Sequence, residues 1–155
     1  MSSQRLTITR AQIHEVNALY AIETAAHDLP WSLNLLSTSF DSPQRVYKLY
    51  RNEQIIGFAV VIFALEQWEL LDIAINPAVQ GQGLGRFLLE GLIEFAAKEN
   101  AAEIFLEVRQ SNLAAIRLYS RCDFKQVGLR RNYYPVKNGR EDALVMKLCL
   151  RKRFE

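Results

Sequence analysis

The chain has 155 residues, of which half are apolar and 23% are charged. This composition is typical of a folded globular protein and excludes the disordered and membrane-spanning classes. The 19 basic and 17 acidic residues leave a net charge of +2, which is too balanced to indicate a nucleic-acid-binding protein. No segment has the apolar run of a signal peptide or a membrane span, so we expect a cytoplasmic protein with no direct nucleic-acid or membrane partner.

The sequence contains no internal repeat, low-complexity segment or flexible linker, and its length suits one hydrophobic core. We therefore expect a monomer with a single domain over residues 1–155, with a core over about 5–149 and a short basic C-terminal tail. Cys122 and Cys149 lack a CxxC spacing and a paired histidine. Their context predicts two small core residues rather than a disulfide or a zinc site.

The N-terminal third predicts one strand followed by two helices. The residues "RLTIT" alternate as a strand from Arg5 to Thr9. Over residues 10–26 mostly apolar side chains recur at helical spacing. The positions concerned are Ile13, Val16, Leu19, Tyr20 and Glu23. After Pro30, Ser32 is placed to cap a short second helix.

The middle of the chain predicts an antiparallel meander and then a long helix. Two strands flank a polar turn at Arg51–Gln54, and a third strand, "QWELLDIAI", ends at Asn76 and Pro77. A helix is predicted from Leu84, because apolar residues then recur at helical spacing while charged residues take the opposite face. The apolar positions are Leu84, Phe87, Leu88, Leu92, Phe95 and Ala96.

The C-terminal third predicts a strand, a helix and two closing strands. "EIFLEV" is the strand, and the helix after it is opened by Ser111 or Asn112. "FKQVGLR" and "DALVMKLCL" then predict two strands around a long polar loop. The complete order predicts an α/β fold of the mixed α+β type, in which helices flank a mostly antiparallel sheet.

The stretch "QGQGLG", residues 80–85, runs directly into the predicted long helix. The first backbone N–H groups of a helix have no intrahelical partner, so they favour an anionic group, and glycines let such a group approach the backbone. The spacing fits neither the dinucleotide fingerprint GxGxxG nor the P-loop, which ends in Gly-Lys-Ser/Thr. An anion-binding loop and an ordinary glycine-rich turn therefore both remain open.

The same stretch matches the Q/R-x-x-G-x-G/A signature of the GCN5-related N-acetyltransferase (GNAT) family through Gln80, Gly83 and Gly85. The order of elements also resembles that family over nearly the whole chain. Four stretches resemble in particular its bacterial ribosomal-protein-alanine N-acetyltransferases, the RimI type. They are "LPWS", "DIAINPAVQGQGLGRFLLE", "FLEVRQSNLAAIRLY" and "RRNYYPVKNGREDALVMKL".

This resemblance implies a GNAT fold and an acetyl-CoA-dependent enzyme that needs no metal. It implies direct acetyl transfer, in a ternary complex, to the N-terminal alanine of a small-subunit ribosomal protein. Two alternatives remain: a related enzyme that acts on lysine side chains or a small-molecule amine, and a regulatory module that binds acetyl-CoA without catalysis. The resemblance also assigns the residues that contact acetyl-CoA. They are Ile73, Ala74, Ile75, Gly81, Gln82, Gly83, Leu84, Gly85, Arg86 and Asn112.

Glu107 is the candidate base. In its strand, Glu107 points away from Leu106 and Val108, which leaves a carboxylate near the end of a strand that otherwise reads as buried. Burial of this kind would raise its pKa toward a useful range. A glutamate that faces water, or that pairs with Arg109 or Arg130, is the alternative. The resemblance implies that Glu107 is the proton acceptor.

Tyr119 is the candidate acid. It shares a helix face with Ala115 and Cys122, a pattern that by itself fits a core tyrosine equally well. The resemblance implies that Tyr119 protonates the departing thiolate. Asn112, by contrast, has two competing roles, because it is also placed to cap the helix that contains Tyr119.

Large aromatic residues with polar tips, expected in loops, are the candidate walls of an acceptor groove. They are Trp31, Tyr133 and Tyr134. Packing against the sheet is the alternative for all three. An acceptor terminus followed by basic residues would be helped by a nearby carboxylate, and the sequence does not choose among the four that we considered. These are Glu23, Glu66, Glu69 and Asp72.

Two positions depart from the pattern of the RimI type. Asp123 stands where a glycine usually ends the second of the long helices, and glycine there suits a left-handed backbone. Aspartate tolerates that conformation better than most residues, so we expect a cost in stability rather than in chemistry. Asp72, which precedes Ile73, is the second departure, and its charge could alter acceptor preference.

Overall fold

The computed structural model describes residues 5–151, so most of the predicted basic tail lies outside the described residues. The described chain contains seven strands, four α-helices and three short 3₁₀ helices. The strands are β1 (Leu6–Arg10), β2 (Gln44–Arg51), β3 (Gln54–Phe63), β4 (Gln67–Ile75), β5 (Glu103–Arg109), β6 (Lys125–Val136) and β7 (Gly139–Cys149). The helices are η1 (Ile13–Glu15), α1 (Val16–Ala26), α2 (Leu33–Ser37), η2 (Thr38–Phe40), η3 (Pro77–Val79), α3 (Leu84–Lys98) and α4 (Leu113–Arg121).

The described chain divides into two compact units. The N-terminal unit contains residues 5–63 and 71–92, and the C-terminal unit contains residues 64–70 and 93–151. The order of hydrogen-bonded strands is β1-β2-β3-β4-β5-β7-β6, and β4 contributes residues to both units. The predicted mixed fold with a mostly antiparallel sheet and flanking helices is confirmed. The extension of one domain over residues 1–155 stays a prediction.

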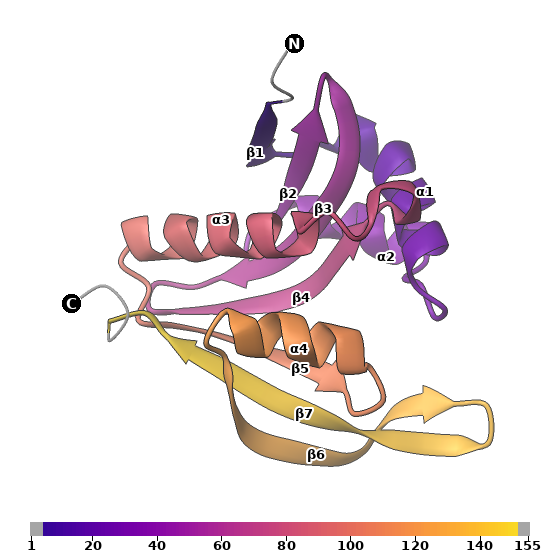
Figure 1. Ribbon diagram of the computed structural model, residues 1–155, viewed down its shortest axis with the longest axis vertical. Helices are drawn as coiled ribbons and strands as arrows, with labels where there is room; N and C mark the ends of the chain where they lie inside the picture. The colour runs from indigo at the N-terminus through magenta and orange to yellow at the C-terminus, as the bar shows by residue number, and fades with distance from the viewer. Residues whose placement is uncertain (1–4, 152–155) are drawn as a thin grey trace. The chain divides into compact units, whose positions relative to one another are not determined.

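In the N-terminal unit, β1, β2 and β3 pair antiparallel. Asn52 and Glu53 both have left-handed backbone angles in the β2–β3 turn, as a tight two-residue hairpin requires. The side chain of Ser32 accepts a hydrogen bond from Leu35 N, so the predicted cap of α2 is confirmed. Helices α1 and α2 pack on these strands through one apolar cluster (Figure 1). Its buried members are Ala11, Leu19, Ile22, Leu36, Val46, Phe58, Val60 and Ala74.

In the C-terminal unit, residues 67–70 of β4 pair parallel with β5, and β7 pairs antiparallel with both β5 and β6. The β6–β7 hairpin, drawn in orange and yellow in Figure 1, replaces the long polar loop that the sequence predicted. That loop prediction is wrong because Lys137 and Asn138 form a tight two-residue turn, and Val136 already pairs with Gly139 (φ 137°) across it.

The strand β6 contains an irregular segment next to this hairpin. Arg130 pairs with Ala143 and Tyr134 with Glu141, so three residues of β6 lie opposite one residue of β7. Asn132, in the middle of the three, has a left-handed backbone (φ 51°). Its N–H donates to Asp142 Oδ1 at 2.9 Å. We call residues 131–133 the β6 bulge; such insertions turn a side chain to a new direction.

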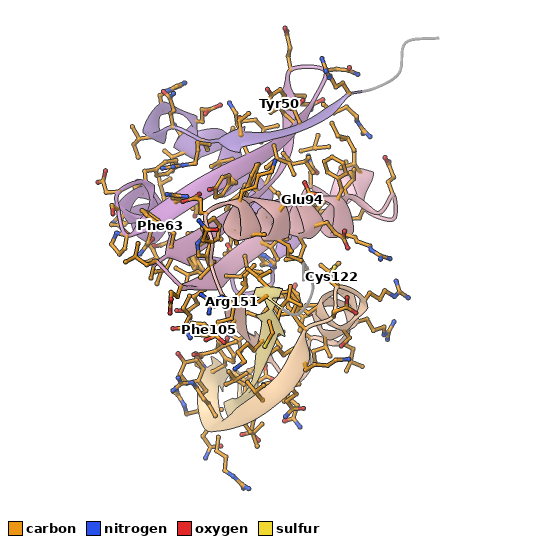
Figure 2. All side chains as sticks on the ribbon, turned by 90° about the vertical axis from the view of Figure 1, so that its left-hand side faces the viewer. Tyr50, Phe63, Glu94, Phe105, Cys122 and Arg151 are labelled. Carbon is orange, nitrogen blue, oxygen red and sulfur yellow. The ribbon has the colours of Figure 1, made fainter. Side chains whose placement is uncertain are left out.

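One burial prediction is wrong, and two apolar residues at the predicted helical spacing are exposed. Cys149 is exposed, because the alternation of β7 turns Met146, Leu148 and then Leu150 inward and leaves Cys149 on the other side. Phe87 is 41% exposed, since it lies at the margin of the buried stripe of α3. Ile13 is 52% exposed in the 3₁₀ turn that precedes α1. Cys122 is buried, as predicted, and Figure 2 labels it at the end of α4.

The end of α4 is a Schellman motif. Asp123 has φ 72°, its N–H donates to Ser120 O, and the N–H of Phe124 donates to Tyr119 O. The rings of Phe124 and Tyr119 are in contact, with their centroids 5.9 Å apart, which completes the motif. The predicted left-handed conformation of Asp123 is therefore confirmed. Among residues 5–151, no helix is both long and apolar enough to cross a membrane.

We expect Asp123→Ala to reduce the free energy of unfolding by about 1 kcal/mol, because alanine lacks the short polar side chain that eases the left-handed conformation. Asp123→Gly should be at least as stable as the natural chain. Chemical denaturation of the three proteins at neutral pH measures the order. An alanine variant as stable as the glycine variant would contradict the assignment of strain to this position.

A close approach of β3 to β4 allows only glycine at position 57. A Cβ added to Gly57 would lie 2.9 Å from the backbone oxygen of Ala74 and 2.6 Å from Ile75 Cδ1. We expect Gly57→Ala to destabilise the protein by about 1–3 kcal/mol, since the backbone of β4 has to move. Gly128→Ala is the matched control, because its Cβ would meet only ordinary contacts with Val145 at 3.6 Å. Equal thermal stability of both variants would disprove the close approach.

Candidate functional site

The glycine-rich stretch forms an open loop before α3. Gly81 (φ 83°) and Gly83 (φ 74°) both have left-handed backbones, and a Cβ at either position would meet nothing within 4 Å. The carbonyl of Gly83 accepts from Phe87 N, so α3 begins directly after it. The N–H groups of Leu84, Gly85 and Arg86 therefore belong to the first turn, where no intrahelical carbonyl can pair with them. This arrangement suits an anionic group such as a phosphate.

Two polar side chains of the loop stabilise it through hydrogen bonds. Gln80 Nε2 donates to Ile75 O at 3.2 Å, and Arg51 donates to Gln82 Oε1 at 3.0 Å. Arg86 is more than half exposed and lies 3.6 Å from Glu90 in the next turn. A cation next to free amides adds to their attraction for an anion, although Glu90 offsets part of it.

The strand segment Ile73–Ile75 lies directly before this loop. Ala74 is buried, whereas Ile73 and Ile75 are half-buried. Two of the three backbone carbonyls accept hydrogen bonds from side chains: Ile73 O from His27 and Ile75 O from Gln80. The predicted contact residues of the loop and of this segment thus lie in one continuous stretch of the N-terminal unit. Asn112 is the exception, because it belongs to the C-terminal unit.

Asn112 caps α4. Its Oδ1 accepts from Ala115 N at 3.2 Å, which resolves the choice between Ser111 and Asn112 as the opening residue. Ser111 instead donates its hydroxyl to Glu141 at 3.1 Å. Of the two roles considered for Asn112, the side-chain oxygen therefore performs the capping of α4.

Glu107 lies on β5 with only 12% of its side chain exposed. Its Oε1 is 3.1 Å from Arg130 Nε, so the pairing with Arg130 that the sequence left open is present. Arg109 is engaged elsewhere, 3.2 Å from Glu141. The phenol of Tyr133 is hydrogen bonded to Glu107, and this hydrogen bond raises the pKa of Tyr133. Glu107 is thus a carboxylate held between a guanidinium and a phenol.

Glu69 is a second carboxylate in this group. The parallel register sets Glu69 beside Phe105, two residues before Glu107 on β5, so both glutamates project from the same face. Burial, followed by the negative charge of Glu107, raises the pKa of Glu69, and Arg130 opposes the rise. The sequence named Glu69 only as one of four acidic candidates, because the pairing of β4 with β5 is not visible in residue spacing.

Tyr133 and Tyr134 lie in strand β6 rather than in a loop, which corrects the sequence prediction. Their rings meet edge to face at 5.0 Å, and the guanidinium of Arg130 lies over Tyr133 at 5.5 Å. Burial, with the charge of Glu107, raises the pKa of Tyr134 to about 12. Both aromatic candidates of the C-terminal unit therefore gather around Glu107.

The β6 bulge fixes these aromatic residues. Arg140 donates to the carbonyls of Asn132 and Tyr133 at 2.6 and 2.7 Å. Arg109 donates to Pro135 O at 3.1 Å and lies over the ring of Tyr134 at 4.4 Å. The position of Tyr133 thus depends on two arginines that do not themselves pair with Glu107.

Tyr119 lies on α4 and is 7% exposed. Its ring contacts Phe124, and the Schellman motif holds its carbonyl. Tyr119 is therefore packed in the C-terminal unit as a core tyrosine would be, which was the alternative interpretation of this residue. Its role as an acid stays a prediction.

Trp31 is half-buried and packs against the apolar cluster of the N-terminal unit. Its backbone N–H donates to Glu23 Oε2 at 2.9 Å. Glu23 also lies 3.7 Å from His27 Nε2, which is 3.2 Å from Asp72 Oδ1. The sequence did not single out His27. The spacing of four residues between Glu23 and His27 could have indicated that the two side chains meet on one helix face. Nothing in the sequence indicated that Asp72 lies beside them.

Comparisons with known proteins give a consistent result. The model of the Acetyltransferase (GNAT) family matches residues 11–124. The [ribosomal protein bS18]-alanine N-acetyltransferase of Escherichia coli K12 is 41% identical over 142 residues, which cover 92% of this chain and 96% of that enzyme. The Haemophilus influenzae enzyme of the same name is 42% identical over 145 residues, which cover 92% and 98%. The crystal structure of the ribosomal-protein-S18-alanine N-acetyltransferase from Escherichia coli superposes with a TM-score of 0.89 at 40% identity, covering 94% of each chain.

The carboxylates around Glu107 generate a prediction for pKa values. In ¹³C NMR titrations the pKa of Glu69 should lie above 4.5, its ordinary value. Arg130→Met should raise it further, because the opposing cation is removed, and Glu107→Gln should lower it, because the neighbouring negative charge is removed. Lys125→Met removes an exposed cation from the same strand and serves as the control. A pKa of Glu69 that changes in neither the Arg130 nor the Glu107 variant would contradict the electrostatic coupling.

Proposed function

The chain belongs to the GNAT family of acetyltransferases, and on this premise we propose that it is an acetyl-CoA-dependent N-terminal α-amino acetyltransferase. Its proposed acceptor is the N-terminal alanine of a small-subunit ribosomal protein. The observation that carries the proposal is the identity of about 40% with enzymes named for this reaction, over more than nine-tenths of both chains.

The chemistry of the acceptor favours a terminal amine. An α-amino group has a reference pKa of about 7.7–8.0, against about 10.4 for a lysine side chain. Near neutral pH the terminal amine is therefore roughly a hundredfold richer in the unprotonated form that attacks a carbonyl. An enzyme for this acceptor needs to remove one proton as the new C–N bond forms, and to supply one to the group that leaves.

The open loop and the first turn of α3 fit acetyl-CoA. Gly81 and Gly83 leave room beside the backbone, and the unpaired N–H groups of residues 84–86 are donors for a pyrophosphate. Residues 73–75 offer backbone groups to the acetyl and pantetheine part in the manner of an added strand. Asn112 adds a polar contact. Acetyl-CoA supplies the acetyl group as a thioester, and a strand N–H polarises its carbonyl.

Glu107 accepts the proton that the attacking amine loses, directly or through one water. Arg130 and Tyr133 support this role, since they fix the orientation of the carboxylate from two sides. Glu69 adds a second acidic group on the same face, which favours an acceptor with a basic residue near its terminus. Of the other acidic candidates, Glu66 pairs with Arg151, whereas Glu23 and Asp72 face each other in the N-terminal unit.

Tyr119 donates its phenolic proton to the departing thiolate. A fixed ring suits this role, because the Schellman motif and the contact with Phe124 leave the hydroxyl group little freedom. Trp31 of the N-terminal unit, and Tyr133 and Tyr134 of the C-terminal unit, are each proposed to contact the acceptor peptide. The reaction balances without an enzyme-bound intermediate, because one proton leaves the amine and one returns to the thiol.

We expect a peptide that begins Ala-Arg to receive one acetyl group from acetyl-CoA, as measured by intact mass. Glu107→Gln should reduce kcat/KM by about a hundredfold or more, because the proton acceptor is lost. Glu103→Gln is the matched control: Glu103 lies on the same strand and also pairs with a cation, Lys147. A large and equal loss in both variants would contradict the role of Glu107.

The same assay separates the alternatives. A second peptide with a blocked terminus and a free internal lysine tests for a lysine enzyme, and its acetylation would overturn the proposed acceptor. Binding of acetyl-CoA without transfer to either peptide, or to a panel of small amines, would identify a module without catalysis. Tyr119→Phe should retain acetyl-CoA binding and lose turnover.

A further inference from the structure

A polar cluster in the N-terminal unit is not explained by the chemistry above. It joins Glu23 of α1, His27 at the end of that helix, and Asp72 of β4. The ring nitrogen His27 Nε2 lies 3.2 Å from Asp72 Oδ1, 3.0 Å from Ile73 O and 3.7 Å from Glu23 Oε1. Glu23 is 1% exposed and the side chain of Asp72 is 9% exposed, so the two carboxyl groups are almost closed to water, whereas the side chain of His27 is 32% exposed.

The hydrogen bonds of this cluster do not balance if both carboxyl groups are ionised. Glu23 Oε2 accepts from the N–H of Trp31, and Asp72 Oδ1 shares the single Nε2–H of His27 with Ile73 O. The other two oxygens, Glu23 Oε1 and Asp72 Oδ2, then have no donor although both are buried. A buried oxygen without a donor destabilises the fold, and more so when it is charged.

One proton removes the imbalance. The side chains of Glu23 and Asp72 are within hydrogen-bonding reach of each other, so a proton on Glu23 gives Asp72 its second donor and leaves no oxygen unpaired. The cluster then contains one carboxylic acid, one carboxylate and one imidazolium, and its net charge is zero. Buried ionisable groups reach this kind of neutral arrangement because charge in a low dielectric is costly.

The charges around the cluster support the same assignment. Burial, followed by the hydrogen bond and the charge of Asp72, raises the pKa of Glu23 to about 8. The hydrogen bond to Asp72 raises the pKa of His27 to about 9, with the charge of Glu23 acting in the same direction. Among the neighbouring elements, Glu15 of η1 forms a charged pair with Lys48 of β2, and the buried residues that α2, β2 and β3 contribute to the core beside α1 are apolar. These are Leu36 of α2, Val46 of β2, and Phe58 and Val60 of β3.

We propose that Glu23 is an un-ionised carboxylic acid that shares its proton with Asp72, and that this proton holds the Trp31 segment and the Ile73 carbonyl in their working positions. Glu23 is thus a positioning residue, and this inference rests on the proposed function for the meaning of Trp31 and Ile73. Loss of the proton sets two carboxylates against each other, and this repulsion, not a weaker acceptor, displaces Glu23 from Trp31 N–H. The acceptor path then loosens as the pH rises.

The first test reads the proton directly. In ¹³C NMR of the natural chain, the carboxyl of Glu23 should titrate near pH 8, while the exposed Glu94 (Figure 2) serves as an internal reference on α3. Titration of Glu23 in the ordinary range of glutamate overturns the proposal. This measurement does not depend on activity, so it remains decisive even if the proposed function fails.

The second test compares two substitutions. Glu23→Gln is neutral at every pH, can donate to Asp72 and can still accept from Trp31, whereas Glu23→Ala can do neither. The pKa of Glu23 is raised from 4.5 to about 8 and that of His27 from 6.5 to about 9, so the natural chain should lose stability as the pH rises from about 4.5 through 8 and 9. Glu23→Gln should match the natural Tm near pH 4.5 and lose less of it by pH 9. A Glu23→Gln variant as unstable as Glu23→Ala at pH 6 overturns the shared proton.

The third test concerns positioning. KM for the alanine peptide is measured for the natural chain and for Glu23→Gln, and the first value is divided by the second. Titration of the peptide amine affects both values equally, so it cancels in this ratio. This ratio should be near one at pH 6 and rise about tenfold by pH 9, which corresponds to one lost buried hydrogen bond. A ratio that stays constant with pH overturns the positioning role. Absence of transfer by the natural chain at pH 7 overturns the proposed function instead.

A competing occupant is a cation, because one ligand atom from each of the three side chains lies within 4.8 Å of the others. Zn²⁺ should therefore be titrated into the natural chain and into Glu23→Gln. No change of Tm in either protein agrees with a shared proton. A stoichiometric rise in Tm that only the natural chain shows, and that EDTA reverses, overturns the proposal in favour of a metal centre.

Discussion

A buried carboxylate requires a donor for each of its oxygens, and Asp72 imposes that requirement on the N-terminal unit. Its position in β4 falls in the alternation of Trp68, Leu70 and Ala74, which are all buried. An acidic residue in that register is tolerated only if neighbouring elements supply donors. His27 and Glu23 do so from the far end of α1, and the same contacts fix where the chain leaves the helix toward Trp31.

The elements that the sequence predicted well are those whose signals are local. The long amphipathic stripe of α3, the Ser32 cap of α2 and the left-handed Asp123 at the end of α4 each depend on residues within one or two turns. The glycine loop is local in the same sense, since its backbone angles and the helix behind it follow from six consecutive residues. Local chemistry of this kind survives the tertiary environment.

The features that the sequence missed depend on pairing between distant segments. Arg130 was one of two possible partners for Glu107, and only the register of β5, β7 and β6 selects it. The second half of β6, residues 131–136, was taken for a loop because its polar residues and its bulge break the alternation that marks a strand. His27 gained its partners from a strand 45 positions away, which no periodicity within α1 could indicate.

The β6 bulge separates two roles that a regular strand would have to combine, namely pairing in the sheet and presenting a side chain to Glu107. Pairing resumes at Arg130 on one side and at Tyr134 on the other, so the sheet around β5 is insensitive to the number of residues between them. A one-residue insertion or deletion there would exchange the side chain that meets Glu107 while leaving the hydrophobic interior intact. Residues 131–133 are therefore a segment in which a change of length would alter the contacts of Glu107 at little cost to folding.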